Sequence, residues 1–96
     1  AASDVYKRQT VKPGHSGPFE ELSRKLHQKS LSEDGVISYN FGPMKGEGSE
    51  NEFAFLERWE SIEALEAHME TEHYKEADET CQEHLAEPMQ ISIFEI

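Results

Sequence analysis

The stretch RWESIEALEAHMETEHY, residues 58–74, decides the fold because it joins the end of a strand to the start of a long helix. The segment FAFLERWE at 53–60 is apolar and alternating, as expected of a strand that buries at least one face. Ser61 then offers a hydroxyl to the free backbone N–H groups of a helix, and Glu63 lies near the positive end of the helix dipole. We therefore predict a strand followed by a helix that Ser61 caps.

This second helix is predicted to run over residues 61–86, and Pro88 stops it. One i,i+4 row carries most of its apolar side chains: Leu65, Met69, His73, Ala77, Cys81 and Leu85. Such a row drifts slowly around a straight helix. The pattern therefore predicts a kink or break near residues 71–73.

The rest of the chain supplies one more helix and three more strands. Ser16 is a predicted N-cap for the first helix, which Gly35 closes in a left-handed conformation. The remaining predicted elements are strands over 4–12, 36–41 and 89–96 and a flexible hairpin loop over 42–52. This βαββαβ order predicts a single domain over residues 1–96, an α+β ferredoxin-like sandwich with an antiparallel sheet.

Composition excludes several classes of partner. The chain of 96 residues has a net charge of −11, which repels nucleic acid and anionic membranes. We find neither a transmembrane stretch nor the apolar core of a signal peptide. A single cysteine, Cys81, excludes an internal disulfide and indicates a reducing, cytoplasmic setting. A chain this short has a thin core, which favours a second subunit.

Two segments carry a family resemblance: GVISY at 35–39 and FLERWESIEALEAHMETEHYK at 55–75. From about Val11 to the end, the chain resembles the antibiotic biosynthesis monooxygenase domain family. The resemblance implies a homodimeric α+β barrel in which each subunit keeps a pocket between its sheet and helices. The activities found in such proteins include cofactor-independent oxygenation of phenols and quinols, haem degradation, and isomerisation of small sugar-like phosphates, so the resemblance implies the fold more firmly than the substrate. The first strand departs from the family, because VYKRQ at 5–9 is unusually charged, which leaves open what residues 1–9 contribute.

Glu57 is the most unexpected charge, because alternation places it on one strand face with Phe53, Phe55 and Trp59. A carboxylate on an apolar face must be paired, reach solvent or shift its pKa. Glu57 is therefore a candidate general base toward a phenolic or enolic proton, or else a structural partner of a histidine or a helix N-terminus. Trp59 and Phe55 are candidates to hold a flat aromatic substrate, or else core residues.

Four further side chains complete the candidate site, and most have a structural alternative. His68 and His73 could orient a substrate or move a proton near neutral pH, or be satisfied core and helix-end residues. Tyr39, on the neighbouring strand, could offer its hydroxyl to oxygen. Asn51 could direct its amide to the pocket mouth, or serve the turn before the third strand.

No metal and no cofactor are predicted. His68, His73 and His84 lie among glutamates, but the H-x4-H spacing does not place two ligands on one helical face, as H-E-x-x-H does. The haem-degrading members of the family use a histidine a few residues past the position of Tyr74, where this chain has KEAD at 75–78. Those members also use an asparagine in the first strand, which has no clear match here.

The leading hypothesis is a cofactor-independent monooxygenase that acts on a small aromatic, quinol-like or enolisable substrate. The alternative is a non-catalytic dimeric module for ligand binding or stress response. An isomerase needs cations to hold a phosphate, and residues 50–74 offer only Arg58, on the face opposite Trp59. A cavity that reaches Trp59 would favour the enzyme, whereas closed packing around Glu57 and the histidines would favour the binding module.

Overall fold

The computed structural model describes residues 1–96 and has four strands and three helices, with the predicted second helix divided in two. The elements are β1 (Ser3–Thr10), α1 (Ser16–Ser30), β2 (Val36–Pro43), β3 (Glu52–Trp59), α2 (Ile62–Met69), α3 (Glu72–Gln82) and β4 (Gln90–Glu95). All neighbouring strands pair antiparallel, in the order β2-β3-β1-β4. The chain is therefore the ferredoxin-like α+β sandwich that its sequence predicts.

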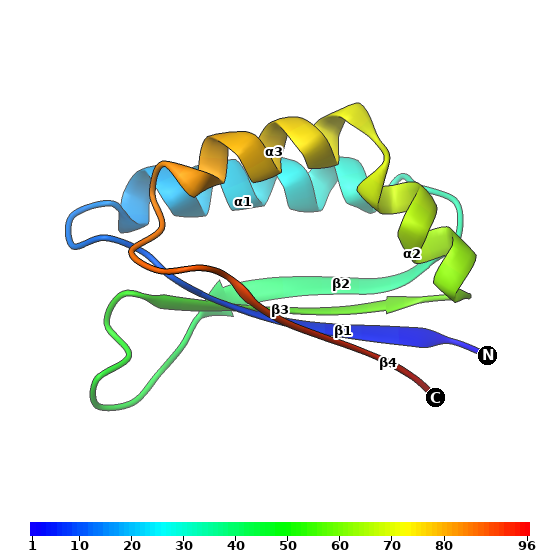
Figure 1. Ribbon diagram of the computed structural model, residues 1–96, viewed down its shortest axis with the longest axis horizontal. Helices are drawn as coiled ribbons and strands as arrows, with labels where there is room; N and C mark the ends of the chain where they lie inside the picture. The colour runs from blue at the N-terminus through cyan, green and yellow to red at the C-terminus, as the bar shows by residue number, and fades with distance from the viewer.

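The sheet is covered on one face only. Figure 1 shows α1 and α3 side by side above the sheet, α2 at one end of this layer, and the other sheet face bare. Alternation decides which side chains point to the helices, and it places Phe53, Phe55, Glu57 and Trp59 of β3 in the interior. The apolar core between the two layers consists of Val5, Val11, Phe19, Leu26, Tyr39, Phe53, Phe55, Trp59, Leu65 and Cys81.

The charged first strand is central to the sheet. β1 pairs with β3 on one side and with β4 on the other. Its interior face carries Val5 together with three polar residues, Ser3, Lys7 and Gln9, which are 0%, 5% and 8% exposed. Residues 3–10 therefore contribute directly to the space between sheet and helices.

The predicted break in the second helix is confirmed. α2 ends at Met69, and α3 begins at Glu72 with the Thr71 hydroxyl accepting a hydrogen bond from the Tyr74 N–H at 3.2 Å. The predicted end at residue 86 is wrong, because α3 stops at Gln82. The chain then pairs with the end of β1, where the Ala86 N–H donates to the Thr10 carbonyl at 2.8 Å. No helix combines the length and the apolar character needed to cross a bilayer.

Of the three residues predicted to cap a helix, Ser61 does so, and Ser16 and Gly35 do not. The Ser61 hydroxyl accepts from the Ala64 N–H at 3.1 Å, so the predicted cap of α2 is confirmed. Ser16 is not a cap: it is the first residue of α1, and His15 holds the N-cap position without a side-chain hydrogen bond.

Gly35 adopts the predicted left-handed conformation, with φ of +87°, but it does not close α1. α1 ends at Ser30, and Leu31 is its C-cap residue. The glycine allows close approach instead: a Cβ at Gly35 would lie 2.7 Å from the Cβ of Ala64. Gly35 thus lets the start of β2 lie against α2.

Candidate active site between the sheet and the helices

An aromatic cluster fills the interior where β2 and β3 meet the break between α2 and α3. The His68 ring lies 4.5 Å from Trp59, 5.9 Å from Tyr39 and 5.0 Å from Tyr74, centroid to centroid. Trp59 and His68 are completely buried, and Tyr39 is 2% exposed. Strand pairing positions the two sheet residues, because Tyr39 lies opposite Glu57, two residues before Trp59. The fold thus brings four of the predicted site residues together in one place: Tyr39, Glu57, Trp59 and His68.

Glu57 is bound on both oxygens by buried partners. Its Oε2 lies 3.1 Å from Lys7 Nζ, and its Oε1 accepts a hydrogen bond from Trp59 Nε1 at 3.1 Å. The Lys7 ammonium also lies 5.3 Å from the ring centroids of Phe55 and Tyr74. These partners are neither a histidine nor a helix N-terminus. The geometry gives Glu57 a structural role, holding Trp59 and neutralising Lys7.

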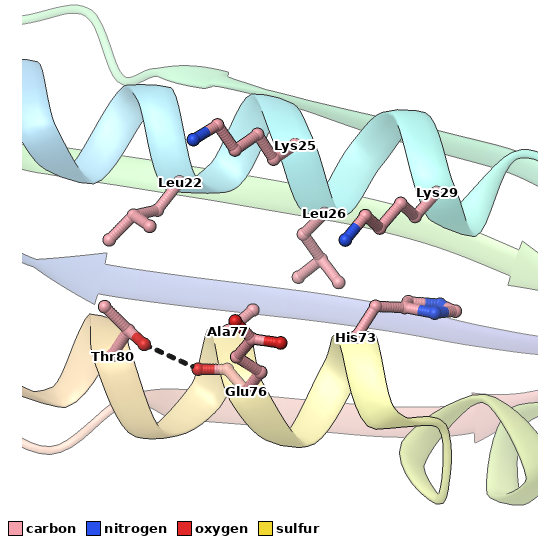
Figure 2. A pocket seen from close by; sticks show the side chains of 8 residues that line it. All are labelled: Leu22, Lys25, Leu26, Lys29, His73, Glu76, Ala77 and Thr80. Atoms are coloured by element: carbon pink, nitrogen blue, oxygen red, sulfur yellow. Dashed lines mark hydrogen bonds between the residues drawn. The ribbon is translucent and has the colours of Figure 1, made fainter.

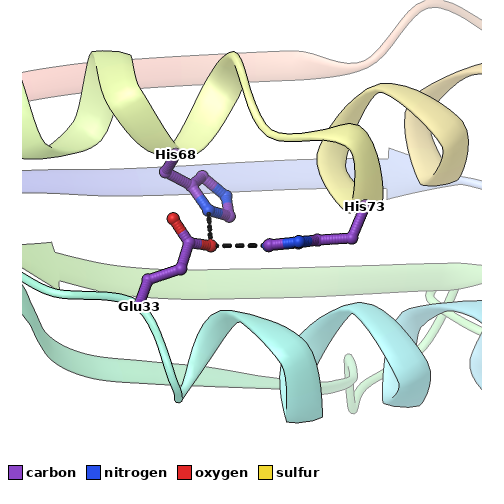
Figure 3. A group of neighbouring side chains, drawn as sticks. All are labelled: Glu33, His68 and His73. Atoms are coloured by element: carbon purple, nitrogen blue, oxygen red, sulfur yellow. Dashed lines mark hydrogen bonds and ion pairs between the residues drawn. The ribbon is translucent and has the colours of Figure 1, made fainter.

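Glu33 joins the two predicted histidines (Figure 3). Its Oε2 lies 2.6 Å from His68 Nδ1 and 2.7 Å from His73 Nε2. An ionised carboxylate can only accept, so both nitrogens carry a hydrogen and donate to the same oxygen. A neutral His68 with its hydrogen on Nδ1 leaves Nε2 as a bare acceptor. That Nε2 is buried and has no hydrogen-bond partner in the protein.

Sequence reasoning missed Glu33, and no local pattern could have revealed it. The residue lies in the turn between α1 and β2, with no periodic neighbours. The H-x4-H argument also fails here, because it assumes one continuous helix. His68 ends α2 and His73 begins α3, so the break places their ring centroids 6.2 Å apart.

Burial sets the ionisation of the cluster. It lowers the pKa of the His68 imidazole, and the nearby Glu33 carboxylate opposes part of this effect. Burial raises the pKa of the Tyr39 hydroxyl, and the negative charge of Glu57 adds to the rise. Tyr39 therefore remains a neutral phenol at physiological pH. Its hydroxyl lies near that of Ser30, but the contact falls short of hydrogen-bond geometry and both hydroxyls are buried without a partner, so Tyr39 is free to donate.

Two small spaces lie near the cluster, on either side of Leu26 and Ala77. A groove of about 80 Å³ lies between α1 and α3, with His73 at one end and two lysines, Lys25 and Lys29, on its α1 side (Figure 2). A smaller space of about 20 Å³ lies beside Lys7 and Tyr74, which is room for roughly one water molecule. Leu26 and Ala77 line both spaces and separate them.

None of the cavities is lined by Trp59. Closed packing surrounds Glu57 and His68, whereas His73 borders the groove. By the criterion set from the sequence, the closed packing at Trp59, Glu57 and His68 favours the binding module, whereas His73 at the groove does not meet that criterion. An enzyme would therefore have to open between the groove and the cluster to admit a substrate.

Asn51 lies apart from the other candidates. It precedes β3, whereas Glu57 and Trp59 lie at the opposite end of that strand, about 20 Å away at the usual rise per residue. Its backbone carbonyl accepts a hydrogen bond from the Val11 N–H at 2.8 Å. The structure therefore places Asn51 in a turn, away from the aromatic cluster.

Comparison with known proteins identifies relatives that match most of the chain. An uncharacterised protein of Synechocystis, sll1783, is 37% identical over 86 residues, which is 90% of this chain and 57% of that protein. "Putative monooxygenase YcnE" of Bacillus subtilis is 35% identical over 65 residues, covering 68% of this chain and 66% of that protein. The chain thus spans less than two thirds of the length of both relatives.

A crystal structure of a conserved protein from Methanosarcina mazei superposes with a TM-score of 0.89 at 27% identity, covering 97% of this chain and 90% of that one. The family model for antibiotic biosynthesis monooxygenase matches residues 5–80. The match begins within β1, earlier than the resemblance in the sequence suggested, and it includes every residue of the aromatic cluster. The chain belongs to the antibiotic biosynthesis monooxygenase family.

Proposed function

We propose that the protein is a cofactor-independent monooxygenase that acts on a small aromatic, quinol-like or enolisable substrate. One observation carries the proposal: His68 Nε2 and the Tyr39 hydroxyl are neighbouring buried polar groups, and neither has a hydrogen-bond partner in the protein. Unsatisfied buried polar groups are uncommon and destabilising. A substrate hydroxyl bound between them would satisfy both.

The proposed roles follow from this geometry. His68 is the general base, and Glu33 holds its Nδ1–H so that Nε2 faces the aromatic interior. His73 acts through Glu33 and is a positioning residue. Tyr39 donates to the substrate oxygen as negative charge develops, and Trp59 and Phe55 provide apolar walls.

The substrate itself supplies the electrons. Loss of a proton from a phenol or enol gives an electron-rich anion that can reduce dioxygen. When a ring methylene becomes a carbonyl, the substrate gives up four electrons and two hydrogens. One oxygen atom enters the product, and the other leaves as water with those two hydrogens. The reaction therefore balances without a further reductant.

A substrate must move side chains to reach His68. The smaller space holds roughly one water molecule and shares Leu26 and Ala77 with the groove, and His68 lines neither space. A rotamer change of Leu26 that connects the two spaces would therefore have to be followed by movement of side chains in the aromatic cluster. Substrate entry from the groove is part of the proposal.

The second candidate function is a binding module without catalysis. It is favoured by the closed packing at Trp59 and by the engagement of Glu57 with Lys7 and Trp59. Such a module would hold a small aromatic ligand in the groove and leave dioxygen unreduced.

We propose a homodimer as the working form. The bare sheet face exposes Leu56 and Phe94, at 57% and 53%. A second copy packed on this face would bury these side chains. The free, buried Cys81 thiol supports a reducing, cytoplasmic setting.

Oxygen consumption tests the catalytic proposal. The chain is incubated with a panel of quinols, anthrone-type phenols and flavonols, and rates are compared with those of the uncatalysed oxidation. His68→Asn is expected to lower kcat by about 10²–10⁴-fold, because it removes the base. His84→Asn is the control: it removes a histidine outside the cluster and is expected to leave the rate unchanged.

Two results would overturn the enzyme reading. One is a rate no faster than the uncatalysed oxidation for every substrate. The other is a rate that His68→Asn leaves unaltered. Saturable ligand binding without turnover, measured by quenching of Trp59 fluorescence, would support the binding module.

A further inference from the structure

Three side chains with metal-binding atoms converge at one point, and the proposed reaction needs none of them to hold a metal. They are Glu33 from the turn after α1, His68 from α2 and His73 from α3 (Figure 3). One ligand atom from each lies within 4.8 Å of the others. The atoms that face each other are Oε2, Nδ1 and Nε2. We propose that this cluster binds one divalent first-row transition-metal ion.

The donor set selects the class of ion. Two imidazole nitrogens and one carboxylate oxygen suit Zn²⁺, Co²⁺, Ni²⁺, Cu²⁺ or Fe²⁺. Mg²⁺ and Ca²⁺ prefer oxygen donors throughout. Both imidazoles would bind as neutral ligands through the nitrogens that now donate to Glu33, and the hydrogen of each ring would move to its other nitrogen.

The side chains need only small movements to accommodate an ion. Bonds of about 2.0–2.2 Å place the donor atoms of a four-coordinate site roughly 3–3.5 Å apart. The present Oε2 distances of 2.6 and 2.7 Å must therefore widen somewhat. The Glu33 and His73 side chains are 13% and 20% exposed, so they can move, whereas His68 is fixed in the core.

Electrostatics favours a cation here. The chain carries a net charge of −11, which raises the local concentration of cations. The site also lies at the C-terminal ends of α1 and α2, where helix dipoles place partial negative charge. The N-terminus of α3 contributes partial positive charge, but the C-terminal ends of two helices outweigh this single N-terminus. Three protein ligands leave at least one coordination position, on the side where His73 borders the groove.

A bound ion would interfere with the reaction proposed above. Coordination through Nδ1 of His68 moves the imidazole hydrogen to Nε2, which removes the bare acceptor. This consequence rests on the proposed function, but metal binding does not. If the chain binds metal but oxidises no substrate, the metal site is therefore upheld and only the proposed monooxygenase activity is overturned.

The experiment is a titration of the EDTA-treated full chain with Co²⁺, followed by visible absorption, and with Zn²⁺, followed by calorimetry. We expect uptake of one ion per chain, and no uptake of Mg²⁺. Glu33→Gln and His73→Asn are each expected to weaken binding by about tenfold or more. Circular dichroism and urea unfolding check that these partly exposed variants fold.

His84→Asn is the matched control, because it dismantles the other close histidine pair, in which the Nδ1 atoms of His15 and His84 lie 3.0 Å apart. Binding should survive this change. Absence of saturable uptake would overturn the site. Uptake that His84→Asn abolishes and that Glu33→Gln and His73→Asn leave intact would overturn it equally, because the ion would then belong to the other pair.

Discussion

Polar side chains in the interior are the residues that define this site. Lys7 and Glu57 face each other across β1 and β3 with side-chain exposures of 7% and 0%. Ions buried this deeply lose their hydration and are tolerable only when each is paired. The pair therefore fixes the position of Glu57, and through it the indole of Trp59. The sequence left Glu57 as either a general base or a structural partner, and these contacts favour the structural role.

Removing either partner of this pair should destabilise the fold strongly. Lys7→Met or Glu57→Gln should each lower the free energy of unfolding by about 3–5 kcal/mol, because the remaining polar group or ion stays buried without its partner. Urea unfolding measures the loss. The double variant should recover much of it, since neither charge remains and the glutamine oxygen still accepts from Trp59.

An exposed ion pair on α1 provides a control. Arg24 lies 3.4 Å from Glu20 there, with side-chain exposures of 59% and 41%. Arg24→Met should cost only about 0–1 kcal/mol, because solvent compensates an exposed pair. Equal losses for the two pairs would contradict the claim that burial makes the Lys7–Glu57 pair important.

At the scale of elements, the break between α2 and α3 and the junction between β2 and α2 build the site. The break turns His73 back toward His68, and Thr71 stabilises it by capping α3. Gly35 allows β2 to begin against α2, with no room for a side chain beside Ala64. These two local features bring Tyr39, Trp59 and His68 together.

Gly35→Ala should separate conformational strain from crowding. The left-handed backbone alone costs an alanine about 1–2 kcal/mol, and the new methyl group would overlap with Ala64, adding about 1–3 kcal/mol. Gly14→Ala is the matched control, because its φ of +85° is similar but its Cβ would meet nothing within 4 Å. The midpoints of urea unfolding of the two variants measure the difference in their stability. If the two substitutions cost the same, the contact with Ala64 is unimportant.

At the scale of the whole molecule, the sandwich has one layer of helices and one uncovered sheet face. Leu56 and Phe94 line a shallow depression on that face together with charged and polar side chains. A chain of 96 residues has little core to spare, so leaving these groups in water is unfavourable. Dimerisation through this face would complete the fold without altering the cluster on the other side of the sheet.

Leu56→Glu should abolish the dimer, because it places a charge at the centre of the proposed interface. Sedimentation equilibrium should show the wild-type chain as a dimer and the variant as a monomer. The melting temperature of the wild type should also rise with protein concentration. Leu31→Glu, at a residue 49% exposed in the turn after α1, is the control and should remain dimeric. A monomeric wild type would refute the assembly.

The sequence by itself determined the order of the elements, the sheet faces, the cap at Ser61 and the break near residue 71. These depend on local periodicity and on backbone hydrogen bonds within a few residues, which a linear pattern records. It also located Trp59, Tyr39 and both histidines as candidates. Only the tertiary structure decided what they contact. Glu33 and Lys7 reach the cluster from segments 35 and 50 residues away from their partners, and no local pattern encodes such contacts.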